Sequence, residues 1–242
     1  MLIYGINSVI EALKADRVAR VRVADRGGAR LAELLRDAAA RGVAVEQVPR
    51  AVLDHAARGG AHQGVVAELR ETRAWSVADL VRGAEGPPLL VVLDGIEDPH
   101  NVGAILRTAD AAGAHGVIRQ TRHAAAMSGV VAKASAGALA HVRIADVVNI
   151  ARAVEELKAL GVWTVGLAGG EPRTCDMMDL TAPTALVLGA EGTGLRRLVR
   201  DRCDHLASIP MLGHVASLNV SVAAGIALFE AVRQRRKGRE KP

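Results

Sequence analysis

Three polar clusters stand out in this sequence because each follows an apolar run of the kind that forms a β-strand. They cover residues 101–109, 188–194 and 209–221. Ligands of α/β proteins bind at the carboxyl ends of strands, so three such strand exits predict one site assembled from distant loops. Burying polar groups costs free energy of folding. A role in an active site would explain why these groups are present despite that cost. The side chains predicted to form this site are Asn101, Arg107, Glu191, Ser217 and Asn219.

The second cluster contains a glycine-rich loop, Gly189-Ala-Glu191-Gly192-Thr-Gly194. Its glycine order is G-x-x-G-x-G, which differs from the G-x-G-x-x-G of dinucleotide-binding turns, and it lacks the lysine of a P-loop. Such glycines would let backbone groups approach a flat ligand closely, although a structural turn explains them equally well. A nicotinamide-dependent dehydrogenase is therefore the least favoured function.

The composition indicates a soluble globular protein with an aliphatic core. Half of the 242 residues are hydrophobic, and only four are aromatic. A chain of this size can bury a large core in one or two domains. Because aromatic side chains are so few, recognition of RNA by base stacking is not expected.

The formal net charge of +5 is compatible with a nucleic-acid partner, but its distribution along the chain matters more than its sum. The basic excess falls in residues 1–73, with 12 basic and 9 acidic side chains, and in residues 233–242, with 6 and 1. The basic C-terminal tail could contact phosphates. An exposed helix end whose cations complement the helix dipole is an equally good interpretation.

The two cysteines, Cys175 and Cys203, have no C-x-x-C partner and no histidine at metal-ligand spacing. Neither a disulfide framework nor a metal site is predicted, and a reducing cytoplasm fits this usage. The N-terminus lacks the pattern of a secretion signal, and no apolar run approaches the length of a membrane span. We therefore expect a cytoplasmic protein without a metal and without a membrane partner.

Strand and helix patterns divide the chain into two predicted domains. Residues 1–73 alternate between the two patterns and form a small α/β unit, while residues 74–88, rich in glycine and proline, read as a linker. From Leu89 onward, strands and helices alternate at a spacing typical of a mostly parallel sheet covered on both faces. Trp163 lies in an apolar strand and is predicted to be part of the core. The strands of the second domain are expected at Leu89–Asp94, Gly116–Ile118, Val142–Ile144, Val162–Leu167, Ala185–Leu188 and His205–Ile209, and its helices at 101–113, 129–138, 149–160, 193–202 and 217–236.

Taken together, the three clusters resemble the three motifs of the SpoU, or TrmH-like, family of RNA ribose 2′-O-methyltransferases, in the SPOUT superfamily. Asn101-x-Gly103-x3-Arg107 resembles the first motif, and Leu188-Gly-Ala-Glu191-Gly192 the second. Ile209-Pro-Met211, continued by Ser217-Leu-Asn219, resembles the third. In addition, Tyr4-Gly5-Ile-Asn7 and His62-Gln63-Gly64 resemble segments of the L30e-like substrate-binding domain that many family members carry.

The resemblance implies a fold, a reaction and partners. The fold is a C-terminal parallel sheet closed by a deep trefoil knot, here roughly residues 184–236 of the domain 89–242, with an N-terminal L30e-like RNA-binding domain. The reaction is transfer of a methyl group from S-adenosylmethionine to the ribose 2′-hydroxyl of a guanosine in 23S rRNA. The partners are ribosomal RNA, free or in a pre-ribosomal particle, and a second copy of the chain in a homodimer.

The resemblance also implies roles for individual residues. Arg107 is the family's principal catalytic residue and has been suggested as the base. Because a guanidinium group keeps its proton at neutral pH, anchoring phosphate and stabilising the developing alkoxide is the favoured role. Asn101 would orient Arg107 or the ribose, and Glu191 would hold the substrate or a neighbouring catalytic group. Ser217 and Asn219 would shape the site at a helix N-terminus, Lys133 and Ser135 would lie near RNA phosphate, and the methyl donor would contact Leu167, Ala168, Gly169, Gly189, Gly192, Ile209, Met211 and Leu218.

One departure from the family pattern and three alternatives remain. Ala140-His141 occupies a place where family members commonly carry an acidic residue, which leaves the substrate contacts there open. The substrate could be tRNA, or another rRNA position of the thiostrepton-resistance type. The chain could also be an RNA-binding ribosome-assembly factor that has lost its chemistry.

Overall fold

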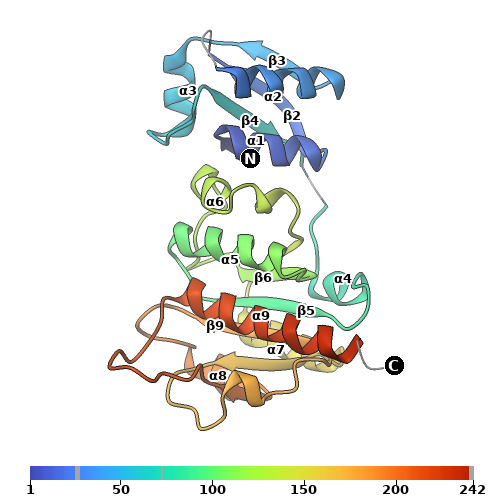
Figure 1. The fold of residues 1–242 in the computed structure, drawn as a ribbon, viewed down its shortest axis with the longest axis vertical. Helices are drawn as coiled ribbons and strands as arrows, with labels where there is room; N and C mark the ends of the chain where they lie inside the picture. The colour runs from blue at the N-terminus through green and yellow to red at the C-terminus, as the bar shows by residue number, and fades with distance from the viewer. Residues whose placement is uncertain (25–27, 72, 240–242) are drawn as a thin grey trace. The chain divides into compact units, whose positions relative to one another are not determined.

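The computed structural model describes residues 1–24, 28–71 and 73–239, and these group into two compact units (Figure 1). The first unit combines residues 1–73 with 102–107 and 126–141. The second combines residues 74–101 and 108–125 with the chain from 142 onward. The domain boundaries expected at residues 73 and 88 stay a prediction.

A small mixed sheet organises the first unit. Its strand order is β1 (Leu2–Tyr4), β4 (Val65–Leu69), β2 (Val18–Val23) and β3 (Ala44–Gln47), with only the β2–β3 pairing parallel. Three helices accompany it because their apolar side chains recur on one face. In α1, for example, Val9, Ala12 and Leu13 are all buried. The helices are α1 (Ile6–Lys14), α2 (Ala29–Ala40) and α3 (Arg50–Ala57).

The first unit also contains α6 (Gly129–Ala134), which is shorter than the helix expected over residues 129–138. The helix ends because Ala136 and Gly137 have positive φ angles of 51° and 97°, which no right-handed helix can accommodate. A short 3₁₀ turn, Ala138–Ala140, follows. A Cβ on Gly129 would lie 2.2 Å from the Tyr4 ring, so only glycine permits this close packing of α6.

The second unit is built on a parallel sheet, as the alternation of strands and helices predicted. The strand order is β10-β8-β9-β5-β6-β7, and every pairing between neighbours is parallel. β5 has the predicted bounds, whereas β7 begins two residues later and extends further than expected. The strands are β5 (Leu89–Asp94), β6 (Gly116–Gln120), β7 (Ile144–Val147), β8 (Trp163–Leu167), β9 (Thr184–Gly189) and β10 (His205–Ala207).

Helices cover this sheet on both faces. Side chains of α4 (Val77–Arg82), α7 (Ile150–Ala159) and α8 (Arg197–Arg202) join alternate residues of β5 and β9 in one hydrophobic core. The long helix α9 (Val220–Arg239) packs on β9, and its inward residues include Ala224 and Leu228 (Figure 1). Within the described ranges, no helix is both long and apolar enough to cross a membrane.

The segment expected to be a linker, residues 74–88, contains the helix α4. Ser76 accepts a hydrogen bond from the backbone N of Asp79 while the Asp79 carboxylate accepts one from the backbone N of Ser76. This capping box satisfies the free N–H groups of the helix start, and Leu80 is fully buried in the core. The glycines and prolines that indicated a linker lie after the helix, at residues 83–88.

One arginine of the basic C-terminal segment, Arg235, is bonded into the fold. Arg235 donates hydrogen bonds to the carbonyl oxygens of Pro87, Pro88, Leu180 and Ala182, at 2.6–2.9 Å. A guanidinium fork suits this task because it presents several N–H donors in one plane. Arg235 thereby ties the end of α9 to the segments before β5 and β9, and it is not available to bind phosphate. Residues 240–242 of the basic tail lie outside the described residues.

Trp163 is not a core residue, contrary to expectation. Half of its surface, 51%, is exposed, and its ring stacks on His205 with the centroids 5.5 Å apart. Trp163 is the first residue of β8, so its side chain lies at the amino end of the sheet, where the covering helices no longer enclose it. The apolar pattern around it predicted burial because a local pattern does not show how far the covering helices extend over the strand.

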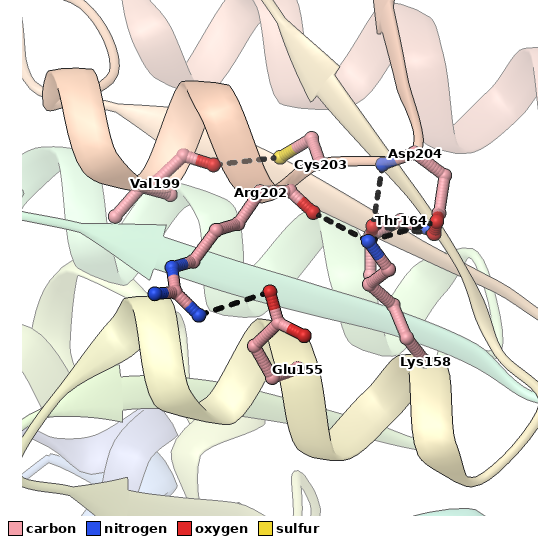
Figure 2. Close-up of polar contacts among 7 residues, drawn as sticks. All are labelled: Glu155, Lys158, Thr164, Val199, Arg202, Cys203 and Asp204. Carbon is pink, nitrogen blue, oxygen red and sulfur yellow. Dashed lines mark hydrogen bonds and ion pairs between the residues drawn. The ribbon is translucent and has the colours of Figure 1, made fainter.

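A polar network joins α7, β8 and α8 (Figure 2). The Asp204 carboxylate accepts hydrogen bonds from the backbone N and Oγ1 of Thr164, at 2.9 and 2.7 Å, and lies 3.2 Å from Lys158 Nζ. Lys158 also donates to the carbonyl of Arg202, whose side chain pairs with Glu155. These contacts fix the turn between α8 and the edge strand β10.

The same surroundings make the neighbouring thiol inert. Burial, reinforced by the nearby carboxylates, raises the pKa of the Cys203 thiol to about 12, and burial likewise raises the pKa of Cys175. A thiol is nucleophilic only as the thiolate. Neither cysteine is therefore prepared for nucleophilic chemistry at neutral pH.

The network predicts acid sensitivity. Burial alone would raise the pKa of the Asp204 carboxyl, but the hydrogen bonds from Thr164 and Lys158 outweigh it and hold this pKa below its usual value. A depressed folded-state pKa stabilises the fold above the unfolded pKa, and this stabilisation is lost as the pH falls through the folded value. We expect Asp204→Asn to unfold at lower urea than the wild type near pH 7, with a smaller further loss on acidification below about pH 4.

Asp201→Asn is the matched control because, within the part of the chain that the structure describes, Asp201 forms only an exposed i,i+4 pair with Arg197, at 3.7 Å. Urea titrations followed by circular dichroism at several pH values measure both effects. An acid response of Asp204→Asn equal to that of the wild type would contradict the assignment.

Candidate functional site

A cavity of about 550 Å³ opens in the second unit at the carboxyl ends of β8, β9 and β10. This volume lies within the range of small-molecule sites, about 300–1,000 Å³. Its wall comes from residues 167–169, 188–195 and 216–220, with Arg200, Ala207, Ile209, Met211 and Ala223 completing it. The wall includes every residue that the sequence suggested for the methyl donor, namely Leu167, Ala168, Gly169, Gly189, Gly192, Ile209, Met211 and Leu218.

The loop after β9 is folded back on itself and forms one side of the cavity. Ala190 and Gly194 exchange two backbone hydrogen bonds, of 3.1 and 2.8 Å, and Gly192 and Gly194 have positive φ angles of 78° and 68°. A Cβ on Gly189 would lie 2.1 Å from the carbonyl carbon of Gly194, so no larger residue fits there. The helix expected to begin at residue 193 begins instead at Arg197, because these glycines shape a loop.

One side chain joins all three polar clusters. The Asn219 amide nitrogen donates to Asn101 Oδ1 at 2.9 Å and to Glu191 Oε1 at 2.6 Å. Asn101 comes from the start of α5 (Pro99–Ala111), Glu191 from the loop after β9, and Asn219 from the residue before α9. Segments more than a hundred residues apart in sequence therefore meet at one amide group, as the three strand exits predicted.

Asn219 also caps α9. Its Oδ1 accepts hydrogen bonds from the backbone N of Ser221 at 2.8 Å and from Ser221 Oγ at 2.6 Å. An asparagine in this position satisfies free N–H groups at the helix start. The cap and the two bonds to Asn101 and Glu191 fix both the orientation of the amide and the point where α9 begins.

The other predicted catalytic residues stand outside this hydrogen-bonded group. Ser217 is exposed and lines the cavity. Arg107 lies on α5, six residues after Asn101, a rise of about 9 Å along the helix axis. Its side chain is exposed and forms no hydrogen bond or ion pair within the described residues. A guanidinium group without a partner is available to an anionic ligand.

The two residues expected near RNA phosphate differ in accessibility. Lys133 is exposed and donates a long hydrogen bond of 3.4 Å to the carbonyl of Ala61. Ser135 is fully buried, and its hydroxyl donates to the carbonyl of Ala132 at 2.9 Å. This burial favours a structural role for Ser135, whereas the phosphate contacts of both residues stay predictions.

Sequence reasoning missed a charged residue in the cavity wall, Arg200. Its guanidinium forms an ion pair with Glu171, from the loop after β8. The pattern around Arg200 indicated only an amphipathic helix, and pairing across loops leaves no trace in a local pattern. Within the described residues, no three His, Cys, Asp or Glu side chains are grouped so that they could hold a metal ion.

Comparison with known proteins places this geometry in a family. Residues 88–229 match the model of the SpoU rRNA Methylase family, and residues 2–75 match that of the RNA 2′-O ribose methyltransferase substrate-binding domain. The chain belongs to the SpoU rRNA methylase family. Both the catalytic part of the SpoU methylase and the substrate-binding part are therefore present.

Individual relatives agree over nearly the whole chain. The 23S rRNA (guanosine-2′-O-)-methyltransferase RlmB of Yersinia pestis is 45% identical over 239 residues, which is 97% of each chain. The SpoU methyltransferase AviRb of Streptomyces viridochromogenes, solved in complex with the cofactor AdoMet, has a TM-score of 0.82 and 30% identity, covering 98% of this chain and 91% of that one. The TrmH/SpoU tRNA modifying enzyme of A. aeolicus, with a TM-score of 0.57 and 32% identity, covers only 67% of this chain and 83% of its own.

The close packing at Gly189 predicts that its replacement disrupts the cavity. We expect Gly189→Ala to lower the free energy of unfolding by about 1–3 kcal/mol or more, because its Cβ must displace the backbone at Gly194 and Leu195. Gly213→Ala is the control, since Gly213 has open space around its Cβ position. Urea denaturation measures both variants. Equal stability of the two would contradict the tight packing.

Proposed function

We propose that this protein transfers a methyl group from S-adenosylmethionine to the ribose 2′-hydroxyl of a guanosine in 23S rRNA. The observation that carries the proposal is the Asn219 amide, which joins the first and second polar clusters to the start of α9 beside the cavity. The proposal is supported by 45% identity over 97% of the chain to an enzyme whose name states this activity.

The cavity fits the donor. Its wall consists mainly of glycines and aliphatic side chains, such as Leu167, Ile209 and Leu218, and of exposed backbone groups in the loop 189–194. A flat adenine ring packs against aliphatic residues, and backbone N–H and C=O groups can recognise its edge. When bound, S-adenosylmethionine supplies a methyl carbon attached to a sulfonium, which is the electrophile of the reaction.

The protein's own residues position the acceptor and stabilise charge. In-line attack by a ribose hydroxyl requires close alignment of the reacting atoms. In this proposal Arg107 holds an RNA phosphate or the developing alkoxide, as a charged donor that keeps its proton. Asn101 and Glu191 are held by Asn219 and are oriented toward the ribose. The start of α9, where the helix dipole is positive, favours negative charge at the same place.

A large-subunit rRNA substrate agrees with the domain content. Residues 2–75 match a substrate-binding domain, and the tRNA-modifying relative aligns with only about two thirds of this chain. Methylation of tRNA, or of an rRNA position of the thiostrepton-resistance type, is the enzymatic alternative. An rRNA substrate implies that the protein works in the cytoplasm, on free RNA or on an assembling ribosomal particle.

The remaining features of the family are part of the proposal. Residues 184–236 are proposed to form the trefoil knot around the donor site. A homodimer is supported by the outward face of α9, where Val222, Ile226 and Phe229 are exposed at helical spacing. In the dimer, Arg107 of one protomer would serve the donor cavity of its partner.

The role of Arg107 predicts a loss of turnover without loss of donor binding. We expect Arg107→Ala to lower kcat/KM about 10²-fold or more, because a charged group that stabilises the transition state is removed. Methyl incorporation into 23S rRNA that lacks the modification measures this, and calorimetry measures donor binding. Arg152→Ala, on the exposed side of α7, is the control.

Three results would separate the alternatives. Full activity of Arg107→Ala would refute the role of this arginine. Calorimetry that detects no S-adenosylmethionine binding to the wild type would favour the non-catalytic assembly factor. Methylation of tRNA in preference to 23S rRNA would favour the enzymatic alternative.

The dimer proposal predicts an effect of charge on α9. Light scattering should give the wild type about twice the 25.3 kDa of one chain. A buried unpaired charge is costly, so Ile226→Glu should shift the protein to the monomer. Val148→Glu is the control, because Val148 is an exposed apolar residue away from α9. A wild type that is monomeric at micromolar concentration would exclude this assembly.

A further inference from the structure

A fully buried carboxylate lies next to the cavity without forming part of its wall. Asp94 is the last residue of β5, and its side chain has no exposed surface. In the parallel pairing of β5 with β9, Asp94 lies opposite Gly189. Gly189 begins the loop 189–195, which we call the cavity loop. Burying a charge is costly unless it is paired and hydrogen bonded, so the partners of Asp94 show what the charge is for.

Those partners belong to one residue, Arg196, at the other end of the cavity loop. The Arg196 backbone N donates to Asp94 Oδ2 at 2.8 Å, and its Nε donates to Asp94 Oδ1 at 2.6 Å. Its Nη2 donates to Gln120 Oε1 at 2.6 Å, and the Gln120 amide donates to the carbonyl of His123 at 2.7 Å. Arg196 is thereby bonded to the carboxyl ends of both β5 and β6.

The cavity loop, which ends at Leu195, is held at its start, in its middle and at its end. At its start the loop leaves β9 at Gly189, and in its middle Ala190 and Gly194 are bonded to each other. At its end Leu195 is buried in the core, and Arg196 is bonded to Asp94. Every residue from 188 to 195 lines the cavity, while Asp94, Gln120 and Arg196 do not.

We propose that Asp94 and Arg196 are positioning residues that hold the loop 189–195 in the conformation that binds the methyl donor. Gln120, the last residue of β6, supports them by accepting a hydrogen bond from the Arg196 guanidinium. The inference rests on the proposed function, since it concerns the same cavity. Asp94 is buried while the Arg196 side chain is 52% exposed, and the cost of desolvating the carboxylate offsets the attraction, so the pair is a weak source of net stability. Its value here is geometric: it fixes where a glycine-rich loop ends.

Calorimetric titration with S-adenosylmethionine tests the proposal. A hydrogen bond to a charged group corresponds to about a tenfold change in an equilibrium constant, so we expect Arg196→Gln to raise the Kd at least about tenfold. Arg196→Lys keeps the charge but cannot bond Asp94 and Gln120 together, and should give an intermediate Kd. Arg197→Gln is the matched control. Arg197 is the adjacent residue, its side chain is 96% exposed, and it does not line the cavity.

A second measurement needs no ligand. Hydrogen exchange of the backbone amides from Gly192 to Leu195 should accelerate in Arg196→Gln and in Asp94→Asn, and should stay at the wild-type rate in Arg197→Gln. If the pair only stabilised the fold, its removal would lower the unfolding temperature. The Kd of the folded protein and the local exchange rates would then be unchanged. Exchange and binding together therefore distinguish positioning of the loop from general stability.

The outcomes separate this inference from the proposed function. Wild-type binding together with an unchanged Kd and unchanged exchange in Arg196→Gln would overturn the positioning role alone. A wild type that binds no S-adenosylmethionine would overturn the proposed function and the inference with it. A raised Kd and faster loop exchange in Arg196→Gln, with Arg197→Gln unaffected, would establish it.

Discussion

The parallel register between β5 and β9 is the constraint on which the site depends. Asp94 lies opposite Gly189 in this pairing, so the loops that follow the two strands leave the sheet at the same level. In the same way Leu167 on β8 lies opposite Ala207 on β10. Because all these pairings are parallel, the loops that follow the strands lie together at the carboxyl edge of the sheet. A single amide, that of Asn219, can then connect three segments.

The sequence was informative where apolar runs are bounded by polar or glycine residues. β5 was predicted with its observed limits because Leu89–Asp94 is a continuous apolar run ending in a charge. The same reasoning predicted that distant polar clusters meet, since every strand of a parallel sheet points the same way. The residues expected to contact the donor all line the cavity, but this agreement came from resemblance to a family and not from periodicity.

The failures have physical causes that a local pattern does not contain. Trp163 lies at the open amino end of its strand, so its apolar character did not imply burial. The segment expected to be a linker contains α4, because the cap formed by Ser76 and Asp79 starts a helix ahead of the glycines and prolines that indicated the linker. Likewise, the pairing of Asp94 with Arg196 spans about a hundred residues, and nothing in either local sequence indicates the other. Long-range polar pairs depend on the fold that brings them together.

The hydrogen bonds of Arg235 determine when the fold can be completed during synthesis. A ribosome delivers the chain from its N-terminus, and domains generally fold as units while they emerge. The carbonyl groups of Pro87, Pro88, Leu180 and Ala182 leave the exit tunnel long before the arginine that binds them. These bonds therefore form only after every strand of the second unit's sheet has been synthesised. Loss of a C-terminal segment that includes Arg235 would remove these four hydrogen bonds, while α9 would still pack on β9 through Ala224 and Leu228.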